Sequence, residues 1–389
     1  MKKILSLLSI FVVLLGLGFV FRDYLANRVI PTTVSEPVAT ESAVNKSYKI
    51  QEIARGLHVP WAMAFTSDSR MLLTERSGRV RVIADGKLLD KPLFTFPDVW
   101  ENSEAGLLGL AIDPEYLKNK YFYTSMTYIK NGEHFLKVVR LKDGSDLATI
   151  DKIILDNVAA SSNHDGSRIK FGPDGKLYVT TGDATKRDLA QDKGSLNGKM
   201  LRLNNDGSIP LDNPTFGSAV YSYGHRNSQG FDWDDRNGKL WATEHGPSGF
   251  DGPGGGDEIN LIKPGRNYGW PLVSHEKELT GTESPKLLFT PAVAPSGAMF
   301  YGGDLLPQFK NNFFFGALRG EGIYRIVIDE DSPEEVASFE KLAGVDFGRI
   351  REIIEGPNGA IYFSTSNTDG RGRTRKGDDK VYKIIPNGK

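Results

Sequence analysis

Residues 169–181 read IKFGPDGKLYVTT, an alternating apolar run, a Pro-Asp-Gly turn and a second apolar run that ends in threonine. Alternation with a period of two is typical of β-strands, and the glycine suits the tight turn between them. Residues 353–365 (IIEGPNGAIYFST) and 231–243 (FDWDDRNGKLWAT) repeat the same order. The three segments therefore predict three similar β-hairpins.

Three looser copies of this pattern occur elsewhere in the chain. They are residues 61–74 (WAMAFTSDSRMLLT), 107–125 (LLGLAIDPEYLKNKYFYTS) and 299–317, with NFFFGA at 312–317 as the second strand. Six regularly spaced hairpins predict an all-β fold, a six-bladed β-propeller. The alternating runs 48–53 (YKIQEI) and 380–385 (KVYKII) are expected to close one blade together. The alternative, two β-sandwich domains, needs a linker that the sequence does not contain.

The composition excludes several classes of protein. The chain of 389 residues has 39% hydrophobic residues, 43 glycines, a formal net charge of −1 and no cysteine. A near-zero net charge gives no long-range field for nucleic acid. Without cysteine there is no disulfide, thiolate metal site or covalently attached haem.

The N-terminus carries a membrane-targeting signal. Lys2 and Lys3 precede an apolar run at residues 4–21, which predicts a helix that is either a cleaved signal peptide or an uncleaved transmembrane anchor. We therefore divide the chain into the signal or anchor (1–24), a flexible linker (25–47) and the propeller (48–389). The positive-inside rule predicts export of the propeller to the periplasmic or extracellular face, attached to the membrane if the segment stays uncleaved.

Two polar clusters flank the best hairpin. His164 lies in NHDGSR just before it, and Asp183 lies in TTGDA just after it. Because a hairpin returns the chain to its starting end, the carboxylate can orient the imidazole as a base. A histidine in such a place, taken alone, is more often a surface or structural residue.

Cationic residues recur in loops of other repeats. They are Arg226, next to Asn227, in YGHRN, Arg349 and Arg351 in GRIR, and Arg319 in ALRGEG. Each alone is consistent with solvated surface charge. Together, on loops that converge on a propeller axis, they favour a ligand with carboxylates, which arginine binds through two parallel hydrogen bonds.

A glycine-rich stretch separates two further groups of oxygen donors. EHGP (244–247) is followed by the glycine-rich residues 248–256, then Asp257 and Glu258, then NYGWP (267–271). Carboxylates and free loop carbonyls are ligands of calcium. The stretch is therefore either a calcium site or only a flexible excursion.

Seven motifs in this order resemble the soluble pyrroloquinoline quinone (PQQ) dependent sugar dehydrogenases, especially the aldose sugar dehydrogenase branch. The resemblance covers residues 48–385. Its carriers are HVPWAMAF, EAGLLGLAIDP, NHDGSRIKFGPDGKLYVTTGD, YGHRNSQGFDW, EHGP with GGDEINLIKPGRNYGWP, PSGAMFYGG and GRIREIIEGPNGAIYF.

The resemblance implies oxidation of aldose sugars at C1 to lactones, with PQQ and Ca²⁺ as cofactors. His164 would be the general base, assisted by Asp183, and an external electron acceptor would reoxidise PQQ. The residues expected to hold PQQ are Arg226, Asn227, Arg349 and Arg351. Two of them, Arg226 and Arg351, would also stabilise negative charge on the reduced cofactor. The backbone carbonyls of Gly246 and Pro247 would hold the calcium at PQQ, and Glu258 with the Tyr268 carbonyl would hold a second calcium.

Two residues depart from the family pattern. Glu104 stands where the family commonly has glutamine, and its charge beside an anionic cofactor is unfavourable unless calcium or an arginine compensates it. Arg319 stands where some relatives have lysine. Both positions belong to the expected cofactor site, so both bear on cofactor affinity.

Two other functions on the same fold are a calcium-dependent lactonase or hydrolase and a non-catalytic extracellular binding propeller. A lactonase needs carboxylates and asparagines on the axis, whereas the matched loop positions here are cationic. A binding module has no need for His164 paired with Asp183. Both alternatives are therefore ranked below the dehydrogenase.

Overall fold

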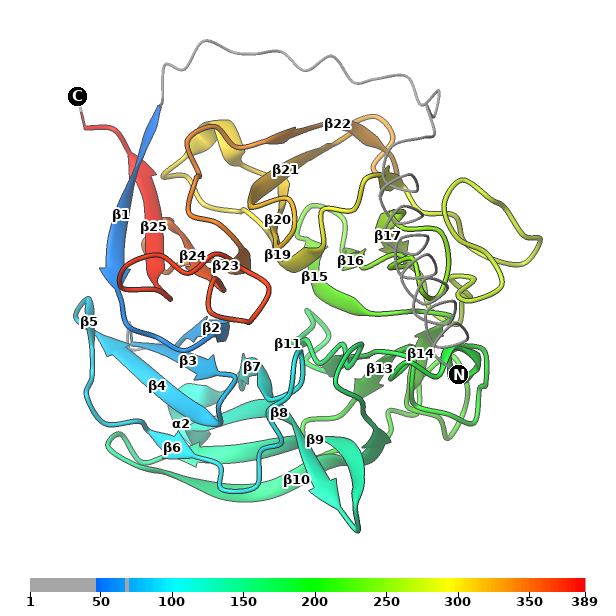
Figure 1. Ribbon diagram of the computed structural model, residues 1–389, viewed down its shortest axis with the longest axis horizontal. Helices are drawn as coiled ribbons and strands as arrows, with labels where there is room; N and C mark the ends of the chain where they lie inside the picture. The colour runs from blue at the N-terminus through cyan, green and yellow to red at the C-terminus, as the bar shows by residue number, and fades with distance from the viewer. Residues whose placement is uncertain (1–46, 67–69, 389) are drawn as a thin grey trace, which may run out of the picture.

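The structure is a computed structural model that describes residues 47–66 and 70–388. The chain forms six antiparallel sheets around a central axis, which confirms the six-bladed propeller (Figure 1). The expected N-terminal helix, nearly all of the linker and the turn at residue 68 lie outside the described residues. None of the helices that the structure describes is long and apolar enough to cross a membrane.

Each sheet is one blade. The strands of each blade follow in order from the axis to the outside of the ring. Blade 1 contains β2 (Pro60–Phe65), β3 (Met71–Glu75), β4 (Arg79–Ala84), β5 (Lys87–Leu88) and β6 (Phe94–Thr95), and blade 2 contains β7 (Leu107–Ile112), β8 (Tyr121–Lys130), β9 (Glu133–Asp143) and β10 (Ala148–Ala159). Blade 3 contains β11 (Ile169–Phe171), β12 (Leu177–Thr181), β13 (Lys199–Leu203) and β14 (Val220–Tyr223), and blade 4 contains β15 (Ser228–Asp234), β16 (Lys239–Glu244), β17 (Asp257–Ile262) and β18 (Leu287–Phe289). Blade 5 contains β19 (Pro295–Phe300), β20 (Phe313–Ala317), β21 (Gly322–Ile328) and β22 (Val336–Lys341), and blade 6 contains β23 (Ile350–Glu355), β24 (Ile361–Thr365), β25 (Val381–Pro386) and β1 (Tyr48–Ala54). Short helices are α2 (Tyr116–Asn119), η1 (Arg187–Ala190) and η2 (Pro307–Phe309).

All six predicted hairpins are the two innermost strands of a blade. In blade 3 the turn closes where Gly172 N donates to Lys176 O and Gly175 N donates to Gly172 O, both at 2.9 Å. Gly175 has φ +70°, a conformation that glycine adopts without steric cost. The turn of blade 6 repeats these two bonds at Gly356 and Gly359, so the GPDG and GPNG motifs form the same structure.

The closing blade is also as predicted. β1 pairs with β25 in antiparallel register, from Tyr48 opposite Pro386 to Ala54 opposite Val381. Figure 1 shows the two strands side by side at the ends of the colour scale. Hydrogen bonds between the two ends of the propeller domain therefore complete blade 6 and close the ring.

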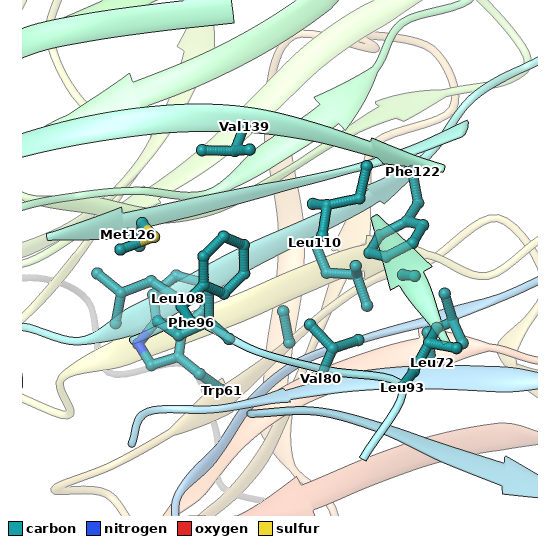
Figure 2. Close-up of a cluster of buried hydrophobic side chains, with 14 of the residues drawn as sticks. Trp61, Leu72, Val80, Leu93, Phe96, Leu108, Leu110, Phe122, Met126 and Val139 are labelled. Carbon is teal, nitrogen blue, oxygen red and sulfur yellow. The ribbon is translucent and has the colours of Figure 1, made fainter. Parts of the chain in front are cut away.

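The described core consists of six clusters, one at each boundary between neighbouring blades. Because side chains alternate along a strand, Leu177 and Val179 face blade 2 while Tyr178 faces blade 4. Figure 2 shows the boundary of blades 1 and 2, where Trp61, Leu72 and Val80 meet Leu110, Phe122 and Val139. Both faces of the inner strands are buried, which explains their nearly continuous apolar sequence.

Five of the six repeats have a serine or threonine near the end of the second strand, and in four of them it has a structural role at the boundary between blades. At four of the six boundaries its hydroxyl donates to a backbone carbonyl at the inner edge of the next blade. These bonds are Thr74 to Leu108 O (2.5 Å), Ser125 to Ser167 O (2.7 Å), Thr243 to Ser296 O (3.0 Å) and Ser364 to Pro60 O (2.9 Å). The hydroxyls thus give buried backbone carbonyls hydrogen bonds that link neighbouring blades.

A buried ion pair crosses the axis. Arg168, directly before β11, donates from Nη1 to Glu352 Oε2 on β23, and from Nε to Gln229 O at 2.8 Å. Its guanidinium lies 4.2 Å from the ring centroid of Trp61. Burial is the largest influence on both charges, lowering the pKa of Arg168 and raising the pKa of Glu352. This pair joins blades 3 and 6, which lie opposite each other in the ring.

We expect Arg168→Met to lower the free energy of unfolding by about 3–5 kcal/mol, because it leaves Glu352 buried without its counter-ion. Chemical denaturation followed by tryptophan fluorescence measures this. Lys118→Ala, which breaks a solvent-exposed pair with Glu115, is the control and should change nothing measurable. An unchanged midpoint for Arg168→Met would contradict the structural role of the axial pair.

Candidate active site

A cavity of about 780 Å³ opens at one end of the axis. Its walls come from two sets of loops, those that lead into an inner strand and those that follow a second strand. Six arginines line it, Arg76, Arg226, Arg319, Arg349, Arg351 and Arg371, with three carboxylates, Glu104, Asp257 and Asp369. The volume suits a small-molecule ligand, and the excess of arginine favours an anionic one.

His164 and Asp183 meet at this cavity, as the hairpin between them predicts. His164 Nδ1 lies 2.9 Å from Asp183 Oδ1, and Asp183 Oδ2 accepts from Trp270 Nε1 at 2.8 Å. A carboxylate at Nδ1 selects the tautomer with the proton on that nitrogen, which leaves Nε2 basic. Nε2 has no hydrogen-bond partner among the described residues. The pair is therefore arranged as an oriented base.

Close backbone packing fixes the position of this base. His164 has φ +63°, and its carbonyl accepts from Ala184 N at 3.0 Å. A Cβ on Gly182 would lie 1.8 Å from the His164 carbonyl oxygen, so only glycine allows this approach. In TTGDA, Gly182 thus leaves space for the His164 backbone, and Asp183 supplies the carboxylate that binds the imidazole.

Arg349 and Arg351 share one carboxylate. Asp369 Oδ2 accepts from Arg349 Nε at 2.8 Å and lies 3.6 Å from Arg351 Nη2. Arg351 Nη1 donates to Gln229 Oε1 at 2.9 Å, but its buried Nε has no partner in the described part of the chain. Burial lowers the pKa of Arg351 to about 10, while Asp369 acts in the opposite direction. Arg351 therefore remains charged at neutral pH, and it shares the carboxylate of Asp369 with Arg349.

Asn227 is fully buried next to Arg226 and does not itself line the cavity. Its Oδ1 accepts from Gly166 N at 3.0 Å, whereas its buried Nδ2 has no partner in the described residues. Two buried donors, Asn227 Nδ2 and Arg351 Nε, thus lack an acceptor. Such groups are costly unless a ligand or water satisfies them.

Arg226 is held by residues of the glycine-rich stretch. Its Nε donates to Asp251 Oδ2 at 2.7 Å and its Nη2 to Ser248 Oγ at 3.0 Å, while Nη1 lies 3.3 Å from His245 O. The arginine and aspartate side chains are both buried. Part of the charge expected for a ligand is therefore already balanced by Asp251, whose role no sequence pattern indicated.

Glu104 has the compensating arginine that its charge required. Arg371, from the loop between β24 and β25, donates from Nη1 to Glu104 Oε1 at 2.6 Å, and Glu104 Oε2 accepts from His164 N at 3.2 Å. Burial opposes ionisation of Glu104, but Arg371 and two nearby histidines outweigh it and lower its pKa to about 2. The carboxylate is therefore charged at neutral pH and linked to the backbone of the base.

Gly246 and Pro247, whose carbonyls the sequence predicts as metal ligands, both line the cavity. Gly246 N donates to Asp257 Oδ1 at 2.8 Å, and Pro247 O accepts from Gly255 N at 3.2 Å. Asp257 Oδ2 also accepts from Val293 N at 2.7 Å. Asp257 therefore fixes the backbone that presents these two carbonyl oxygens.

Glu258 belongs to a separate buried group. It lies opposite Glu244 in the ladder between β16 and β17, and Asn260 Nδ2 donates to its Oε2 at 2.9 Å. Burial, and then Glu244, raise the pKa of Glu258 to about 8. Asn260 Oδ1 is buried with no partner in the described residues. Tyr268 is buried nearby, its ring stacked on His225, which itself bonds Glu244. Adjacent carboxylates with an unused amide oxygen fit a cation.

Arg319 lines the cavity with an exposed side chain and follows β20, whereas Arg226 and Arg349 precede inner strands.

Other residues of the lining were not predicted from the sequence, namely Arg76, Gln229, His245, Asp369, Arg371 and Phe250. A signal existed for Arg76 and His245, because each is the second residue after the threonine of its repeat, as Asp183 is after Thr181. Arg371 and Phe250 lie in long loops outside the repeat and have no such signal.

Comparisons with known proteins show the family of the chain. A family model described as Glucose / Sorbosone dehydrogenase matches residues 57–374. The chain is 31% identical over 352 residues to the aldose sugar dehydrogenase YliI of Escherichia coli K12, covering 84% of this chain and 92% of that protein.

Two solved structures superpose closely on this one. A Thermus thermophilus oxidoreductase of the glucose dehydrogenase type has a TM-score of 0.80 and 40% identity, covering 87% of this chain and 100% of that one. The PQQ-bound aldose sugar dehydrogenase of Streptomyces coelicolor has a TM-score of 0.76 and 31% identity, covering 87% and 98%. Both similarities extend over nearly the whole propeller.

We expect Glu104 to make stability depend on pH. Its pKa of about 2 lies below the ordinary 4.5, so its contribution is complete above pH 4.5 and is lost as the pH falls toward 2. Glu104→Gln should therefore be less stable than wild type at pH 7, by up to about 3 kcal/mol, and the gap should narrow between pH 4.5 and 3.

Urea unfolding of both proteins at several pH values measures this gap. Glu115→Gln, at an exposed carboxylate, is the matched control and should follow wild type at every pH. A gap between Glu104→Gln and wild type that stays constant from pH 7 to 3 would contradict the assignment.

Proposed function

The chain belongs to the Glucose / Sorbosone dehydrogenase family, and from this membership we propose that it oxidises aldose sugars at C1 to lactones with PQQ as cofactor. The observation that carries the proposal is the oriented His164–Asp183 pair at the wall of an arginine-lined cavity. A relative 31% identical over almost the whole propeller is solved in a PQQ-bound form.

The donors in this cavity fit PQQ, whose acceptors are carboxylates and quinone oxygens. Arg349 and Arg351 carry two positive charges against the single Asp369, and Arg351 Nε and Asn227 Nδ2 have no acceptor in the described residues. Arg226, Asn227, Arg349 and Arg351 would therefore hold the cofactor, with Arg319 at the rim. When bound, PQQ supplies the two-electron acceptor for the hydride that C1 of the aldose loses as the lactone forms.

The protein's part in the reaction is to move one proton. His164 Nε2 takes the proton of the C1 hydroxyl while Asp183 stabilises the resulting imidazolium through Nδ1. Trp270 holds the other oxygen of Asp183 and so fixes the plane of the pair. The charges of Arg226 and Arg351 stabilise the negative charge that reduction leaves in the cavity.

Calcium completes the proposal at two places. The carbonyls of Gly246 and Pro247 would hold a calcium ion beside the cofactor, which polarises it as a Lewis acid. Glu258, with the Tyr268 carbonyl, would hold a second calcium in a structural role. The raised pKa of Glu258 and the unused Asn260 oxygen support a cation at the second place.

Export and electron transfer follow from the sequence alone. The lysines and apolar run of residues 1–24 support a propeller outside the cytoplasm, anchored or secreted. The chain has no cysteine and therefore no attached haem. The electrons would pass to an external acceptor.

The decisive test is dye reduction by the purified full chain with PQQ, Ca²⁺ and a panel of aldoses. We expect activity that requires PQQ and falls by about 10²–10⁴ in His164→Ala, since a positioned base contributes that much. His134→Ala, at a histidine on β9 outside the cavity, should retain activity. Calcium-dependent lactone hydrolysis without any redox activity would replace the proposal with the hydrolase.

Comparison of the calcium-free protein with the calcium-loaded protein provides a second test. We expect Ca²⁺ to raise the melting temperature of the wild-type apoprotein, because a ligand that binds only the folded state stabilises it. The calcium-induced increase in melting temperature should be smaller in Glu258→Gln than in wild type. In Glu278→Gln, at an exposed carboxylate, it should equal that of wild type. Equal shifts in wild type and Glu258→Gln would exclude Glu258 as a ligand.

A further inference from the structure

The glycine-rich stretch 248–256 forms part of the cavity wall. Ser248, Gly249, Phe250 and Gly254 all line the cavity. Its C-terminal root is fixed, because Gly256 N donates to Phe289 O and to Thr290 Oγ1, both at 2.9 Å. The stretch therefore returns to the propeller at a defined point and presents Gly249 and Phe250 to the ligand space.

Phe250 is at the tip of this wall and lies beside the base. Its ring centroid is 6.2 Å from that of His164, and the two rings are within 18° of parallel. The phenylalanine is 74% exposed. Exposing a large aromatic side chain to water is unfavourable, so its position beside a catalytic base needs a physical explanation.

The neighbouring residue holds Phe250 in this position. Asp251 Oδ2 accepts from Arg226 Nε at 2.7 Å, and Asp251 O accepts from Arg187 Nη1 at 2.9 Å. Ser248 N donates to Asp251 Oδ1 at 2.8 Å, which closes the tip on itself. Three polar contacts thus fix the backbone on the C-terminal side of Phe250, and one of them uses a buried ion pair.

We propose that Phe250 is a substrate-positioning residue, which packs on the C–H face of the aldose ring and holds C1 at His164. This inference rests on the proposed function. A pyranose has one face rich in C–H groups, which carry small positive partial charges and are attracted to the negative face of an aromatic ring. The arginines and Glu104 around the same cavity offer hydrogen bonds to the hydroxyls at the ring edge.

The geometry also explains why an aromatic residue stands beside His164. Phe250 places an apolar ring with its centroid 6.2 Å from that of the imidazole, and His164 Nε2 has no hydrogen-bond partner among the described residues. A sugar that packs on Phe250 loses rotational freedom next to the base, which is the entropic part of catalysis by positioning. The anchor on Arg226 places this contact beside the residues proposed to hold the cofactor.

The test compares steady-state kinetics of Phe250→Ala and wild type with glucose, in the full chain loaded with PQQ and Ca²⁺. We expect KM to rise about three- to tenfold, the value of one aromatic contact, and kcat/KM to fall mainly through KM. Phe250→Trp should restore KM, because it restores the aromatic face. Phe216→Ala, at another exposed phenylalanine (83% exposed) that does not line the cavity, should match wild type.

Saturation-transfer NMR gives a readout independent of turnover. Irradiation of aromatic protons should transfer magnetisation to glucose ring protons in wild type, and the transfer should weaken in Phe250→Ala. An active wild type with unchanged KM and transfer in Phe250→Ala would overturn the role of Phe250 alone. A wild type without PQQ-dependent turnover would overturn the proposed function and this inference together.

Discussion

The ion pair between Arg168 and Glu352 is the constraint on which the closed ring depends. Two charges buried on the axis are stable only while they face each other, because each alone would lose several kcal/mol of hydration without compensation. Arg168 belongs to blade 3 and Glu352 to blade 6. The pair therefore forms only when the half-rings on either side are both complete, so closure at β1 and β25 and the axial contact reinforce each other.

This constraint also shapes the inner strands. Glycines at three of them allow close approach: a Cβ on Gly297 would lie 2.0 Å from Glu352 Oε1, one on Gly109 2.3 Å from Ser167 O, and one on Gly230 2.1 Å from Ser296 O. Larger residues would push the blades outward and separate the loops at the mouth. The 2.9 Å contact between His164 and Asp183 lies within blade 3, whereas the convergence of loops from different blades depends on this packing along the axis.

The sequence predicted what repeats and what lies close along the chain. The six hairpins, the closing blade and the contact between His164 and Asp183 follow from alternation, turn residues and one hairpin. The bond between Arg371 and Glu104 joins residues 267 positions apart, and no local pattern could predict it. The contact of Asp251 with Arg226 arises in a glycine-rich loop whose conformation is set by its two anchor points, not by its own periodicity.

Two groups of buried charges lie along the axis. One is balanced within the protein and contributes to stability, and the other is only partly balanced and suits a ligand. Arg168 is matched by Glu352 within the protein, whereas Arg349 and Arg351 share only Asp369 and leave Arg351 Nε without an acceptor in the described residues. Burial lowers the pKa of Arg351 to about 10, because holding that charge out of water is unfavourable. An anionic ligand would offset this cost by satisfying the same donors. The cavity therefore carries positive charge and an unpaired donor that suit an anionic ligand, whereas the axial pair below is matched within the protein.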